Sequence, residues 1–195
     1  MKKLIAFVLA VVMTFGLTAY ASASFVNSPS YNPDPVVDSA TNGDCNGHLI
    51  VTPYRQRYNG SLNSAEIRKL ETAYFTISHA YKITSLNSGL ANLGVPAENL
   101  GVSALFDVKC TIPCSGPYTV QLTSETFKNF VALLHYVDGN WEIVENASAN
   151  GTTLTFTVNS LSPFAVVVNT KGTGSGDVVD VVPPQELNVQ AAVEE

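Results

Sequence analysis

Beyond Gly101 the apolar residues recur at every second position in several short runs, and this constrains the fold more than any other feature of the chain. The clearest runs cover 104–110, 118–122 and 154–158. Successive side chains of a β-strand point to opposite faces, so each run predicts a strand with one solvent-exposed face. The run 164–168, opened by Pro163, is apolar throughout and predicts a strand covered on both faces.

Tight-turn signals connect these runs. Asp138-Gly139-Asn140 separates the expected strands 130–137 and 141–145, and Asn150-Gly151 precedes the strand at 153–158. Glycine accepts the positive φ that two-residue hairpin turns require. We therefore expect an antiparallel, β-sandwich-like region over 102–169.

The segment 63–101 has the period of a helix instead. Asn63 is followed three residues later by Glu66, which is the pattern of a capping box. The apolar positions that follow at steps of three and four are Ile67, Leu70, Tyr74, Ile77 and Tyr81. A second short helix is expected over 85–94. The expected fold is α+β, with two short N-terminal helices packed on the antiparallel β region as one domain.

Both ends of the chain are expected to lie outside this domain. Lys2 and Lys3, the apolar run 4–12 and the small residues 21–23 have the features of a signal peptide over 1–23, so the mature protein is expected to be secreted. A cut after residue 21 and an uncleaved signal-anchor are the alternatives. The proline-rich segment 24–62 is expected to be an extended lead-in with one short strand at 48–52. The glycine-rich segment 170–195 is expected to be a flexible, disordered tail, with 178–182 as an alternative added strand.

The charge of the chain excludes several partners. The formal net charge is −6, and removal of the two signal-peptide lysines makes the mature chain more acidic still. An acidic surface repels phosphate backbones, so no nucleic-acid partner is expected. No second apolar run approaches the roughly 18 residues that cross a bilayer, so no membrane span is expected in the mature form.

Three cysteines, Cys45, Cys110 and Cys114, are an odd number for an exported protein. The simplest interpretation is one disulfide and one free thiol, and the sequence does not choose among the possible pairings. Together with His48 the cysteines also have the donor types of a tetrahedral zinc site, although the spacing from Cys110 to Cys114 is looser than that of a usual zinc knuckle. Free buried thiols are the third possibility. No cofactor is expected.

The sequence contains no catalytic motif. The Gly-x-Ser-x-Gly turn of α/β-hydrolases is absent, and His135 lies in an apolar strand, where a hydrogen-bonded structural histidine is the favoured interpretation. His79, on the first helix, is expected to be exposed. A glycoside hydrolase needs two opposed carboxyl groups. The candidate carboxylates, which no diagnostic context surrounds, are Asp107, Glu125, Asp138, Glu142 and Glu145.

Trp141 is the candidate residue for stacking a sugar ring, because an amphipathic ring binds the face of a pyranose. It directly follows the turn at 138–140 and alternates with Ile143. Packing over the edge of the sheet is therefore the favoured interpretation.

Five stretches between 63 and 169 occur in the order of a known module. They are 86–96, 102–108, 127–131, 134–142 and 156–168. In this order the chain resembles an uncharacterised extracellular module of secreted and cell-wall-attached surface proteins of anaerobic gut Gram-positive bacteria, and 160–168 is the most specific part of the likeness. The resemblance implies a surface role and no reaction. Members of the group commonly end in a stalk and a Leu-Pro-x-Thr-Gly sorting signal, and this chain has a short stalk and no such signal.

The function expected from the sequence is a secreted, non-enzymatic structural or ligand-binding module at the cell surface. Its ligand is unknown, and a glycan or a surface protein fits the expected location. The alternative is a small carbohydrate-active protein, either a sugar-binding sandwich or a glycoside hydrolase.

Overall fold

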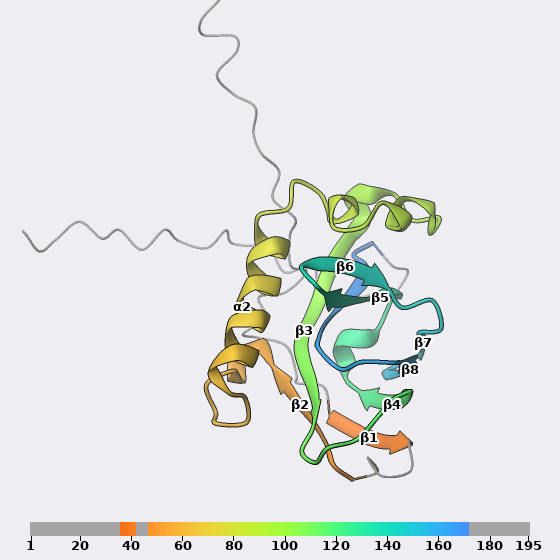
Figure 1. Ribbon diagram of the computed structural model, residues 1–195. Helices are drawn as coiled ribbons and strands as arrows, with labels where there is room; N and C mark the ends of the chain where they lie inside the picture. The colour runs from red at the N-terminus through yellow and green to blue at the C-terminus, as the bar shows by residue number, and fades with distance from the viewer. Residues whose placement is uncertain (1–35, 42–46, 172–195) are drawn as a thin grey trace, which may run out of the picture.

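The computed structural model describes residues 36–41 and 47–171 (Figure 1). The strands in this part of the chain are β1 (Val36–Thr41), β2 (Leu49–Pro53), β3 (Leu100–Cys110), β4 (Tyr118–Thr123), β5 (Phe130–Val137), β6 (Asn140–Ile143), β7 (Ser148–Asn150), β8 (Thr153–Val158) and β9 (Pro163–Asn169). The helical elements are the α-helix α2 (Ser64–Ser78) and the 3-10 turns η2 (Tyr54–Gln56), η3 (Ile83–Ser85), η4 (Ser88–Asn92), η5 (Ala97–Asn99) and η6 (Glu125–Phe127). The expected signal peptide, and the expected tail beyond Lys171, lie outside the described residues.

The strands form two antiparallel sheets. One has the order β1-β4-β8-β7 and the other has the order β2-β3-β9-β5-β6. Two-residue turns connect β5 to β6 and β7 to β8, as the glycine signals predict, and Gly139 and Gly151 have the required positive φ. The antiparallel, sandwich-like β region is therefore confirmed.

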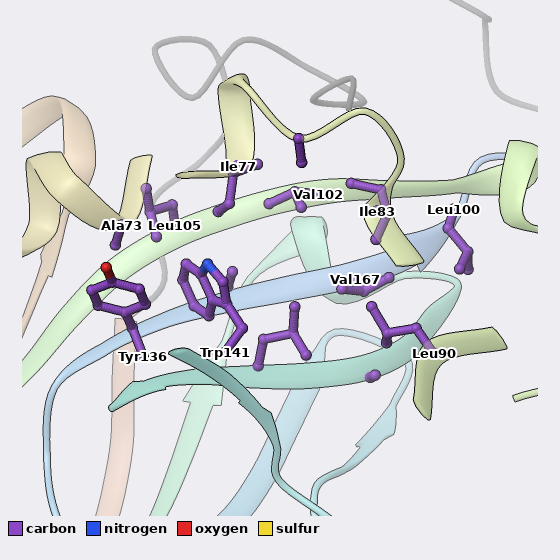
Figure 2. Close-up of a cluster of buried hydrophobic side chains, with 14 of the residues drawn as sticks. Ala73, Ile77, Ile83, Leu90, Leu100, Val102, Leu105, Tyr136, Trp141 and Val167 are labelled. Carbon is purple, nitrogen blue, oxygen red and sulfur yellow. The ribbon is translucent and has the colours of Figure 1, made fainter. Parts of the chain in front are cut away.

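The five-stranded sheet is the middle of three layers. The four-stranded sheet packs on one face, and α2 with η3 and η4 covers the other (Figure 1). The core between the sheets includes Phe106, Val120, Phe156, Phe164 and Val166. The core beneath the helix includes Leu70, Ile77, Leu90, Leu105 and Val167, and Figure 2 shows part of it.

Because the middle sheet is covered twice, its inner strands are buried on both sides. β9 alternates between the two cores, with Ala165 and Val167 under the helix and Phe164 and Val166 between the sheets, as its unbroken apolar run predicts. The prediction of an exposed face was wrong for β3, whose residues 100–108 are all buried. Leu105, on the supposed outer face, belongs to the core beneath α2.

Helix α2 begins at the predicted capping box. Asn63 Oδ1 accepts hydrogen bonds from the backbone N–H groups of Ala65 and Glu66, and Glu66 Oε2 accepts one from the N–H of Asn63. The predicted stripe ends early, because His79 closes the helix and Tyr81 lies beyond it, exposed to solvent.

The second predicted helix was wrong. The segment forms two separate 3-10 turns, η3 and η4, because Asn87 between them is extended. The Asn87 side chain fixes this break: its Oδ1 accepts from the Gly89 N–H at 2.8 Å, and its Nδ2 donates to the Trp141 carbonyl at 2.8 Å. A polar side chain that bonds nearby backbone in this way competes with a continuous helix.

The lead-in contributes two strands rather than the one predicted. β1 pairs antiparallel with β4 and starts directly after Pro35. The prolines that argued against regular pairing therefore all precede the strand. The three-residue strand β7 was also missed, since a strand that short has almost no period to detect.

The packing of α2 on the sheet can be tested at Leu70, which is completely buried. Replacing Leu70 with alanine should lower the free energy of unfolding by about 2 to 5 kcal/mol, because the lost methyl groups leave a cavity. Urea unfolding measures the change. Arg68→Ala, on the exposed side of the same helix, is the matched control and should change stability by less than about 0.5 kcal/mol. A Leu70 variant as stable as this control would contradict the packing.

Candidate functional site

A solvent-open hollow of about 380 Å³ lies where the end of α2 meets the β5–β6 hairpin. Its lining comes from three segments of the chain. The lining residues are Phe75, Thr76, His79, Ala80, Ser85, Leu86, Gly139, Asn140 and Trp141. The end of α2, η3 with Leu86, and the β5–β6 hairpin therefore supply residues to one site.

Trp141 holds these segments together. Its indole Nε1 donates to Thr76 Oγ1 of α2 at 2.8 Å, and its carbonyl accepts from Asn87 Nδ2 at 2.8 Å. Its ring packs at 51° against Tyr136, with 4.9 Å between the ring centroids. Figure 2 shows both rings rising from the hairpin toward α2.

Trp141 is only 4% exposed. A ring with so little free surface lacks the open face that stacking a sugar requires, so the structure places Trp141 as a wall of the hollow. The interpretation that it packs against the sheet fits this position.

The exposed ring at the hollow belongs to Phe75, which is 58% exposed. The imidazole of His79 stacks on it, with 3.9 Å between the centroids and 25° between the planes. His79 Nδ1 lies 3.0 Å from the Phe75 carbonyl, which can only accept, so Nδ1 carries the proton in this contact. In the neutral ring Nε2 is then an acceptor. His79 is exposed, as predicted.

Two further polar side chains on the lining are exposed. Asn140 Nδ2 donates to the Asp138 carbonyl at 3.2 Å, which leaves its Oδ1 as an acceptor. Ser85 Oγ donates to the Lys82 carbonyl at 2.6 Å and keeps its lone pairs. The hollow therefore combines an aromatic surface with groups that can bind hydroxyls.

Among the described residues the lining holds no carboxylate, lysine or arginine, and His79 is its one ionisable residue. None of the five carboxylates proposed for a hydrolase borders it. Glu125 pairs with Lys128 at 2.5 Å, and Asp138 is in the hairpin turn next to the lining. Glu142 lies in β6 opposite His135, and Glu145 follows that strand.

Asp107, the fifth carboxylate, is buried beneath α2 with 5% exposed. It lies opposite Thr52 in the β2–β3 pair, and near it Lys109 forms an ion pair with Glu66 at 3.1 Å. The pKa of Asp107 is raised to about 7, chiefly by burial and to a smaller extent by the Glu66 charge, while Lys69 and Lys109 partly oppose the shift. Desolvation disfavours the charged form, so this carboxyl group is largely protonated below neutral pH.

His135 is buried on the other side of the same sheet. Leu133, two residues before it, belongs to the core between the sheets, and the imidazole stacks on Phe164 with 4.5 Å between the centroids. Burial lowers its pKa to about 4, with a smaller effect from Lys69. Its Nε2 has no hydrogen-bond partner among the described residues, so the structure shows the expected buried histidine without a hydrogen bond at this nitrogen. The sheet separates it from Asp107, so the two do not form a catalytic pair.

Cys110 and Cys114 form a disulfide that closes the loop after β3. This is one of the pairings that the sequence allowed. Zinc ligation requires free thiolates, so these two residues cannot serve as ligands while bonded to each other. Cys45 lies outside the described residues.

The His48 carbonyl accepts from the Thr111 N–H at 2.8 Å, which places the lead-in beside the loop. Within 36–41 and 47–171, no group of three or more His, Cys, Asp or Glu is placed to hold a metal ion.

Phe75 is the site residue that the sequence reasoning missed. It lies off the apolar stripe of α2, next to Tyr74. The available signal was an aromatic residue on the polar side of a helix, followed at i+4 by a second ring, His79. Residues at this spacing are neighbours on a helix surface.

Comparisons of the chain with protein-family models, with curated proteins and with solved structures found no match. Within the described ranges, none of the helices has both the length and the apolar character needed to cross a bilayer.

Asp107 gives the stability of the protein a specific dependence on pH. In the unfolded chain this carboxyl group ionises near 3.8, and in the folded protein only near 7. The folded state therefore holds the extra proton between these values, and stability is lost as the pH rises through this window. Relative to the wild type, Asp107→Asn should become more stable at pH 8 than at pH 4, by on the order of a few kcal/mol.

Urea unfolding of both proteins at intervals from pH 4 to pH 8 measures this difference. Because His135 is present in both, its own titration cancels in the comparison. Parallel stability curves for the two proteins would show that Asp107 does not titrate as described.

Proposed function

We propose that the mature protein is an extracellular, non-enzymatic binding module that takes its ligand in the hollow between α2 and the β5–β6 hairpin. The single observation that carries the proposal is the exposed Phe75 ring beside a recess with hydrogen-bonding side chains. Ligand sites in proteins are concave, and they combine apolar surface with a few placed polar groups.

An extracellular location is supported by the N-terminal sequence and by the resemblance to a secreted surface module. Lys2, Lys3, the apolar run 4–12 and the small residues before 24 are together typical of an export signal. Binding, rather than a purely structural role, is supported by the position of Phe75: its exposed ring borders a recess that polar side chains also line.

The alternative of a glycoside hydrolase requires two carboxyl groups facing each other across a cleft, about 5 to 10 Å apart. Since the lining of the hollow includes no carboxylate, this site does not supply the required pair. The sugar-binding form of the alternative needs no such pair and remains compatible with the hollow.

Binding is tested by applying the chain 24–195 to arrays of glycans and of bacterial and host surface proteins. We expect at least one ligand whose binding is weakened in Phe75→Ala. Tyr58→Ala is the matched control, because Tyr58 is also a strongly exposed aromatic residue but lies outside the hollow, where it contacts Arg57 and Glu71. If no ligand binds, or if both variants bind as the wild type does, the proposed site is refuted.

Export is tested separately by N-terminal sequencing of the protein recovered from the culture medium of its host. Cleavage after Ala23 predicts a chain that begins at Ser24. Recovery of the intact N-terminus in the membrane fraction would instead support the signal-anchor alternative.

A further inference from the structure

We propose that the hollow binds an uncharged saccharide, with one face of a sugar ring stacked on Phe75 and its hydroxyls bound by Asn140, Ser85 and His79. This inference rests on the proposed function, because it names the ligand class of the same site. It assigns the stacking role to a helix residue rather than to Trp141 of the hairpin.

Phe75 gives the hollow an exposed aromatic surface. Phe75 is 58% exposed and borders the hollow, whereas Trp141, the other ring in the lining outside the stacked pair, is 4% exposed. The face of an aromatic ring is electron-rich, so it attracts the polarised C–H groups on one side of a pyranose. This is the contact that an exposed, apolar ring beside polar groups favours.

Contacts within α2 hold the Phe75 ring in place before any ligand arrives. His79 stacks on the ring and is itself bonded to the Phe75 carbonyl through Nδ1, and Ser78 Oγ donates to the same carbonyl at 3.1 Å. Ordering such a surface in advance lowers the entropic cost of binding. A side chain in the interior of a regular α-helix is also restricted in its rotamers.

The polar side chains of the hollow match the hydroxyls of a sugar. These hydroxyls lie around the sugar ring, and they both donate and accept hydrogen bonds. The Asn140 amide offers both a donor and an acceptor, Ser85 offers a hydroxyl, and His79 offers Nε2. All three side chains are exposed and border the hollow. Groups of this kind set the orientation of a ligand that apolar stacking alone would leave free to rotate.

The charge and the volume of the hollow favour a small, neutral ligand. Among the described residues no lysine or arginine borders the hollow, so it has no permanent cation to pair with a carboxylate or sulfate, and the chain as a whole is acidic. This disfavours sialylated, uronic and sulfated sugars. The volume of about 380 Å³ is at the lower end of the range for small-ligand sites, which suits a terminal sugar unit better than a long chain.

The test is saturation-transfer NMR and calorimetry on the chain 24–195. The neutral probes are the trisaccharides of glucose, N-acetylglucosamine, mannose and galactose, and the anionic probes are sialyllactose and a chondroitin sulfate hexasaccharide. We expect binding of at least one neutral probe, with saturation strongest on one face of a single ring. In Phe75→Ala the affinity should fall about three- to tenfold, the usual worth of an aromatic contact, and in Asn140→Ala it should fall as well. Tyr58→Ala should bind as the wild type does.

The possible results distinguish failure of the saccharide inference from failure of the proposed binding module. Phe75-dependent binding of a protein on the array, with no neutral sugar bound, would overturn the saccharide inference and leave the binding module standing. Binding of anionic probes alone, or neutral-sugar binding unchanged in Phe75→Ala, would also overturn the inference. Circular dichroism of each variant shows whether a lost signal reflects unfolding, and Phe75→Tyr, which keeps the ring, should retain binding in a folded protein.

Discussion

The structure depends on a central sheet that is apolar on both of its faces. Each inner strand of this sheet supplies side chains to two cores, and neither the helix layer nor the four-stranded sheet alone would cover it. Burial of apolar surface is the dominant favourable contribution to folding, so the sheet requires both covers. The position of α2, and with it the hollow at its end, follows from this requirement.

A few directed hydrogen bonds complete the layer formed by α2, η3 and η4. Packing brings α2 onto the sheet, but apolar contacts have little directionality, and the bonds of Trp141 to Thr76 and Asn87 fix the relation between the helix, the turn before η4 and the hairpin. Leaving a buried indole N–H unpaired would carry a desolvation penalty, so this arrangement is favoured over alternatives that slide the helix. Phe75 precedes Thr76 in α2, and it lines the same hollow as Asn140 of the hairpin.

Local sequence patterns predicted where helices, turns and strands lie better than they predicted which of their faces other elements cover. The capping box at Asn63, the hairpin turn at Gly139 and the doubly buried strand 163–169 are each encoded within a few neighbouring residues, and each was predicted. The burial of Asp107 was missed because an alternating strand shows that two faces differ, and it cannot show that a helix covers the polar one. The break at Asn87 depends on a bond to Trp141, which lies 54 residues away, and the candidate site depends on the same long-range contacts.

Trp141 ties the helix to the hairpin from within the core. It is the single tryptophan of the chain, so its indole N–H gives one resolved signal for hydrogen exchange measured by NMR. We expect exchange much slower than that of a free indole, and markedly faster exchange in Thr76→Val, which removes the acceptor while keeping the shape. An indole that exchanges at the free rate in the wild-type protein would contradict the account.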